Sequence, residues 1–165
     1  MAETQPRATG AERIEAAFEA ARAEGRAALM PYMMGGFPDP ESSTRIAHAY
    51  ADGGADLIEM GVPFSDPLAD GPVIHEAATA ALKAGVRLET VLAVCREVSP
   101  RVPVVLMAYT NMILGGDGPA GFAARASEAG ASGVIVPDLP LGEDEEARRI
   151  LGEAGLAVIP LVAPT

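Results

Sequence analysis

The sequence predicts a parallel α/β fold, in which helices cover a sheet of parallel strands. Short apolar segments alternate five times with stretches that have the apolar period of a helix. The connections between them are short, which favours right-handed crossovers between neighbouring strands. An open Rossmann sheet is the main alternative. It is disfavoured because the first predicted strand is followed by the pair Gly35 and Gly36 and not by a GxGxxG fingerprint.

Apolar runs bounded by glycine or proline predict the strands, because such runs are too short for typical helices. The predicted strands cover residues 28–34, 57–60, 104–107, 133–136 and 156–162. Residues 1–10 are expected to form a flexible polar tail, and residues 11–165 the folded domain.

Helices are predicted from apolar residues at helical spacing and from their start and stop signals. Asp39 and Pro40 offer a capping side chain followed by a proline at the first helical position. Gly85 stands where a helix end needs left-handed backbone, and a second helix follows at once in the same crossover. The predicted helices cover residues 14–24, 40–51, 73–84, 88–98, 121–129 and 143–151.

The composition indicates one folded domain with no nucleic-acid surface. The 165 residues are 49% hydrophobic and 21% charged, which is typical of a folded protein. The net charge of −11 and the scattered arginines argue against binding along a phosphate backbone. The single cysteine, Cys95, lies in an apolar helical stripe and is expected in the core.

The remaining composition signals point to a cytoplasmic protein without a metal. No segment approaches the roughly 18 consecutive apolar residues of a membrane span, and the start of the chain lacks the apolar stretch of a signal peptide. His48 and His75 have no metal-ligand spacing, and both are expected to be exposed or without a partner.

The stretch LIEMGVPFSDPLADGPVI, residues 57–74, carries the strongest chemical signal. A buried run ends on Glu59, and a proline-stiffened loop then holds Asp66 and Asp70. Burying an ionised carboxylate is costly, and the carboxyl ends of parallel strands are where ligands usually bind. Alternatively, Glu59 is a salt-bridged strand end and the aspartates are turn formers or helix caps.

This stretch resembles the second strand and loop of the tryptophan synthase alpha chain family. Three further segments match the family: PYMMGGFPDP, LMAYTN and GVIVPDLPL. The resemblance implies a (β/α)8 TIM barrel, of which this sequence holds the amino-terminal portion, about five of eight βα units. It also implies retro-aldol cleavage of indole-3-glycerol phosphate to indole and glyceraldehyde 3-phosphate in tryptophan biosynthesis.

The resemblance carries roles onto individual residues. Glu59 matches the catalytic glutamate, which serves as general acid and base, and we expect burial to raise its pKa, with Met60 and Phe64 beside it. Asp70 matches the aspartate that contacts the indole nitrogen. Tyr32 and Tyr109 match substrate-binding aromatic positions.

The resemblance further implies an α2β2 assembly with a beta chain that carries pyridoxal phosphate, so that this chain itself needs no cofactor. Asp66 and Asn111 match positions that contact the beta chain, although both residue types are also common turn formers. Because the phosphate-binding loops of such barrels follow the last strands, this chain alone is expected to be incomplete for activity. The alternative function is a truncated, non-catalytic fragment that only binds the beta chain.

Overall fold

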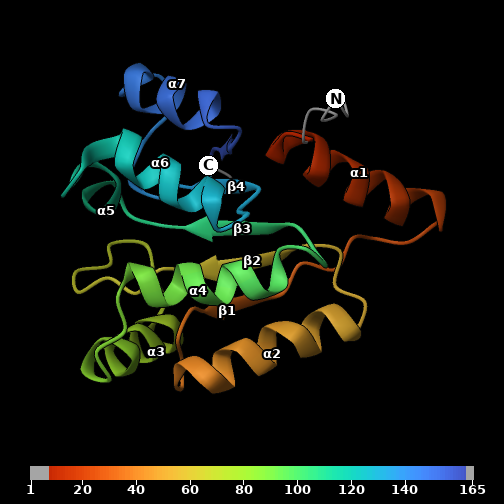
Figure 1. Ribbon diagram of the computed structural model, residues 1–165, viewed down its shortest axis with the longest axis horizontal. Coiled ribbons are helices and arrows are strands. Elements are labelled where there is room, and N and C mark those ends of the chain that lie inside the picture. Colours follow the sequence, from red (N-terminus) through yellow and green to blue (C-terminus); the bar gives the residue numbers. More distant parts are fainter. Residues whose placement is uncertain (1–7, 163–165) are drawn as a thin grey trace, which may run out of the picture.

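The computed structural model describes residues 8–162, which form one parallel sheet with helices around it. The strands pair in chain order, and every neighbouring pair is parallel, as expected (Figure 1). The strands are β1 (Tyr32–Met34), β2 (Ile58–Gly61), β3 (Val104–Met107), β4 (Gly133–Ile135) and β5 (Ala157–Ile159).

The helices connect successive strands, except for α1, which precedes the sheet. They are α1 (Gly10–Ala23), α2 (Pro40–Asp52), α3 (Pro72–Lys83), α4 (Leu88–Val98), α5 (Thr110–Leu114), α6 (Gly118–Glu128) and α7 (Glu145–Glu153). In Figure 1 the strand arrows point away from α1 and toward α5, so α1 lies near the amino ends of the strands and α5 near their carboxyl ends. None of the helices within residues 8–162 has the length and apolar character needed to cross a membrane.

The first and last strands are shorter than predicted, and prolines explain both differences. Residues 28–31 run beside β2, but Pro31 has no N–H and contributes only its carbonyl, which accepts from the Glu59 N–H at 3.0 Å. Pro160 likewise follows the last paired residue of β5, Ile159. A missing backbone donor therefore sets one end of each strand.

Side-chain caps set several helix starts. The predicted cap at Asp39 is confirmed, because its carboxylate accepts from the Ser42 N–H at 2.8 Å. Helix α1 begins at Gly10, earlier than expected, with Thr9 and Glu12 forming a reciprocal capping box. Residues 9 and 10 of the predicted tail thus belong to the folded part, and residues 1–7 lie outside the described residues.

The core lies between the outer face of the sheet and helices α2, α3, α4, α6 and α7. Ile58, Met60 and Leu106 point into it and are fully buried. Cys95 is also fully buried there, as predicted, and burial raises the pKa of its thiol to about 12. A thiol held in its neutral form fits a core residue and not a nucleophile.

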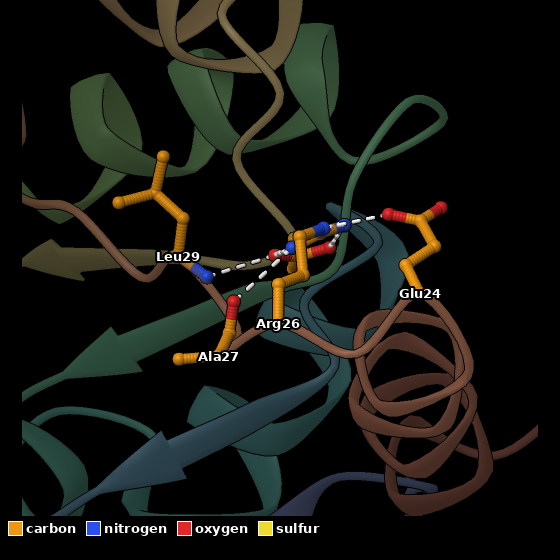
Figure 2. Close-up of polar contacts among 5 residues, drawn as sticks. Glu24, Arg26, Ala27 and Leu29 are labelled. Atoms are coloured by element: carbon orange, nitrogen blue, oxygen red, sulfur yellow. Dashed lines mark hydrogen bonds and ion pairs between the residues drawn. The ribbon is translucent and has the colours of Figure 1, made fainter.

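A charged network fastens the segment before β1 to the start of β2. The Arg26 guanidinium makes two hydrogen bonds to the Asp56 carboxylate, at 2.6 and 2.8 Å, and one to Glu24 at 2.6 Å. Arg26 also donates to the Ala27 carbonyl, and the Leu29 N–H donates to Asp56 at 2.8 Å (Figure 2). These bonds, of which the one from Arg26 has the largest effect, lower the pKa of Asp56 to about 2.

We predict that Asp56 makes stability fall at acid pH. Its folded pKa lies below its unfolded value, so its contribution is complete above about pH 4 and is lost as the pH falls toward 2. The measurement is the melting temperature, followed by circular dichroism, at pH 5 and at pH 2, about the range set by these pKa values. The melting temperature should fall less over this range in Asp56→Asn than in the unsubstituted protein. Asp117→Asn, at an exposed loop position, is the control. Equal losses in all three proteins would contradict the prediction.

Candidate active site

Glu59 faces the inner surface of the sheet, opposite the core. The side chains on either side of it, Ile58 and Met60, point outward and are fully buried, so the alternation of the strand turns Glu59 inward. Its neighbours in the ladder are Tyr32 on β1 and Val105 on β3. The carboxyl group is half-buried, and burial raises its pKa, as expected from the sequence.

The apolar surroundings of Glu59 differ from those predicted. Met60 lies in the core on the other face, and Phe64 stacks on Tyr109, with ring centroids 5.2 Å apart. Glu59 instead borders a cavity of about 230 Å³ between the sheet and α1. Its apolar lining comes from distant parts of the chain: Ile14, Phe18, Met30, Val105, Ile135 and Ile159.

Tyr32 lies next to Glu59 on the same face, and Gly61 makes room for it. A Cβ atom placed on Gly61 would lie 2.1 Å from the Tyr32 hydroxyl oxygen and 3.3 Å from the Met34 methyl group. Burial raises the pKa of the Tyr32 hydroxyl, and the negative charges of Asp70 and Glu59 raise it further. The hydroxyl therefore stays protonated beside the two acids.

Asp70 belongs to the loop after β2, and Tyr109, after β3, supports that loop. The Tyr109 hydroxyl oxygen accepts from the Ala69 N–H at 3.0 Å, and its ring is almost fully buried. Burial raises the pKa of Asp70, while a hydrogen bond from Tyr109 and the nearby His75 act in the opposite direction. Tyr109 thus holds the loop that carries Asp70.

The structure brings four of the six predicted site residues together. Tyr32 and Glu59 are ladder neighbours, and the Tyr109 hydroxyl accepts from the Ala69 N–H beside Asp70. The charge of Asp70 also raises the pKa of Tyr32. Asp66 and Asn111 are both exposed, and neither lines the cavity at Glu59. Asn111 lines a separate groove of about 440 Å³ with Phe64, Met112 and Arg125, among others.

Two features of the site were not predicted from the sequence. The short helix α5 begins at Thr110, where the backbone N–H and the hydroxyl both donate to Asp138, at 2.8 and 2.9 Å. Asp138, the acid after β4, therefore caps a helix from another crossover. The contact between Gly61 and Tyr32 was not predicted either, because it joins residues of two different strands that are distant in the sequence.

Among residues 8–162, no group of three or more histidine, cysteine, aspartate or glutamate side chains is placed to hold a metal ion. His75 is exposed, as expected. His48 differs from expectation, since its Nδ1 lies 3.2 Å from the Arg101 guanidinium, which also binds Asp52.

The parallel strands in chain order, the helices that cover the outer face and the inward-facing Glu59 define part of a (β/α)8 barrel of the kind that enzymes use. A family model described as tryptophan synthase alpha chain matches residues 18–165. The chain therefore belongs to the tryptophan synthase alpha chain family.

Curated alpha chains from Synechococcus elongatus and Roseiflexus castenholzii are similar to this chain, with 47% and 49% identity over 92% and 93% of it. Solved structures are similar as well. Tryptophan synthase from M. tuberculosis in its open form has a TM-score of 0.88 and 39% identity over 96% of this chain. The alpha subunit from Legionella pneumophila has a TM-score of 0.82 and 38% identity over 88%. The chain spans 58% and 59% of the two curated relatives, and 63% and 56% of the two solved chains.

We predict that Gly61→Ala destabilises the protein by about 1–3 kcal/mol, the usual cost of overpacking, because the new methyl group would overlap the Tyr32 hydroxyl. Urea unfolding measures this cost. In a Tyr32→Ala background the same change should cost clearly less, because the overlapping group is gone. Additive costs of the two substitutions would contradict the contact. Gly152→Ala, at a helix position with nothing near its Cβ, is the control.

Proposed function

We propose that the protein to which this chain belongs cleaves indole-3-glycerol phosphate to indole and glyceraldehyde 3-phosphate, with Glu59 as general acid and base. The observation that supports this most is the inward-facing Glu59 carboxyl, whose pKa is raised by burial at an apolar cavity. A carboxyl with a raised pKa keeps a proton to give near neutral pH and then accepts one back. Membership of the alpha chain family supports indole-3-glycerol phosphate as the substrate.

The reaction needs two proton transfers and the breaking of one carbon–carbon bond. A proton is added to C3 of the indole ring, and the proton of the glycerol hydroxyl on the adjacent carbon is removed. The bond between these carbons then breaks, which leaves neutral indole and an aldehyde. Glu59 is the group that we assign to these transfers, because it lies beside the apolar cavity on the inner face of the sheet.

Asp70 is assigned to the indole nitrogen. When C3 is protonated, positive charge develops on the ring nitrogen, and an anion beside the N–H stabilises it. Burial raises the pKa of Asp70, and Tyr109 and the nearby His75 offset part of that rise in favour of the ionised form. Tyr32, which lies next to Glu59, is the residue that we assign to the face of the indole ring. Tyr109 is assigned to the rim of the same pocket.

We predict that Glu59→Gln lowers the rate of indole formation by at least 100-fold, the lower end of what a general acid–base group contributes. Glutamine keeps the size of the side chain but has no proton to transfer. Indole release from indole-3-glycerol phosphate, measured on the natural protein, tests this. Glu97→Gln, on the exposed side of α4, is the matched control and should retain full activity. Equal activity in both variants would sink the proposed role.

We also propose that the protein pairs with a beta chain in an α2β2 assembly, and that the beta chain carries the pyridoxal phosphate. The exposure of Asp66 and Asn111 supports a contact there, and so does the groove beside Asn111, which lies at the carboxyl-end side of the sheet. This contact is independent of Glu59. A chain that bound the beta chain without cleaving substrate would fit the alternative, non-catalytic function.

We predict that the double variant Asp66→Ala, Asn111→Ala binds the beta chain at least tenfold more weakly, which corresponds to about 1.4 kcal/mol. The readout is the concentration of the protein needed to enhance beta-chain activity. Cleavage of indole-3-glycerol phosphate without the beta chain should be unchanged, because neither residue borders the cavity at Glu59. Glu19→Ala, exposed on α1, is the control. Unchanged half-maximal concentration would remove these residues from the contact.

A further inference from the structure

The Tyr32 hydroxyl is a buried donor without a partner. Its oxygen has no access to solvent, and no group within residues 8–162 forms a hydrogen bond with it. Buried tyrosine hydroxyls usually find a partner, because an unpaired polar group loses its hydration without compensation. An acceptor is therefore expected to come within reach in another state of the site.

Glu59 is the acceptor best placed to do so. It is the direct neighbour of Tyr32 in the β1–β2 ladder, and these two strands lie side by side in Figure 1. The Tyr32 oxygen lies above Gly61, two residues further along β2. Two residues of a strand span about 6.6 Å. A glutamate carboxylate reaches roughly 3.5 Å beyond its Cβ, given bonds of about 1.5 and 1.2 Å. A turn of the Glu59 side chain along β2 thus closes the distance to a hydrogen bond.

The other titratable groups around Tyr32 are less suited to this role. The charge of Asp70, in the loop after β2, also raises the pKa of Tyr32, but Tyr109 and His75 already act on Asp70 in favour of its charged form. From α1, the cavity is lined by the apolar side chains of Ile14 and Phe18. Glu59, in contrast, has no hydrogen bond through its side chain within residues 8–162, and only burial shifts its pKa.

We propose that the Tyr32 hydroxyl donates a hydrogen bond to the ionised carboxylate of Glu59, and that Tyr32 is a positioning residue for the acid and base of the site. The importance of Tyr32 for turnover rests on the proposed function of Glu59. The existence of the hydrogen bond does not depend on that function. A donor to a carboxylate favours its charged form, so Tyr32 offsets part of the burial that favours the protonated form. Tyr32 thus brings the two forms of Glu59 closer in energy.

The test is Tyr32→Phe, which removes the hydroxyl and keeps the ring. Carbon-13 NMR of labelled glutamate side chains, with the Glu59 signal assigned through Glu59→Gln, follows the titration of Glu59 directly and without substrate. Loss of the donor should raise the pKa of Glu59 by about one unit, a typical effect of one hydrogen bond to a charged group. Tyr50→Phe, the same change on α2 at the outer side of the sheet, should leave it unchanged.

Two further measurements separate this role from a structural one. In kinetics, the pH limb that depends on Glu59 should move by the same amount in Tyr32→Phe, with less than about a twofold change in KM. In urea unfolding, the advantage of the unsubstituted protein over Tyr32→Phe should grow as the pH rises through the Glu59 titration, because the bond forms only with the carboxylate. An unchanged Glu59 titration, or a raised KM without a shift, would overturn the proposal.

The outcomes also separate this inference from the proposed function. If the Glu59 titration shifts but the protein releases no indole, the hydrogen bond stands and the lyase assignment fails. If indole release depends on Glu59 but the titration is the same in Tyr32→Phe, the lyase assignment stands and the hydrogen bond is refuted.

Discussion

The alternation of side chains along β2 is the constraint on which the site depends. Burial of Ile58 and Met60 against the helices fixes which face of the strand points outward, and so it forces Glu59 and Gly61 to point inward. A shift of register by one residue would place the acid in the core. The apolar core thus holds a carboxyl group in a place that is unfavourable for its charge, and the raised pKa of Glu59 reflects that cost.

The amino ends and the carboxyl ends of the strands contribute differently to the structure. At the amino ends, Arg26 and Asp56 tie the segment before β1 to the start of β2 through charged hydrogen bonds. At the carboxyl ends, Tyr109 supports the loop that carries Asp70. This separation is typical of α/β barrels, in which one end contributes to stability and the other to chemistry. Substitutions at Asp56 and at Asp70 are therefore expected to have separable effects.

Much of the fold was predictable because its signals are local. The start of α2 follows from Asp39 and Pro40, and the strands follow from short apolar runs. The missed features depend on contacts distant in sequence. Helix α5 is capped by Asp138, from the next crossover, and no local sequence pattern predicts this cap. The position of Glu59 was predictable, but its apolar neighbours were not, since they come from α1 and from strands up to β5. Their proximity is a product of the fold.

The two acids of the site differ in their surroundings, and that difference supports their different assignments. Burial raises the pKa of both. Tyr109 and His75 oppose this rise at Asp70, whereas burial alone acts on Glu59. Environments that separate the titrations of two carboxyl groups allow one to donate a proton while the other stays charged. Glu59 is suited to the first task because no fixed partner commits it to one form. A donor that can reach it only when it is ionised, as Tyr32 is placed to be, would keep both forms accessible during a reaction that needs each in turn.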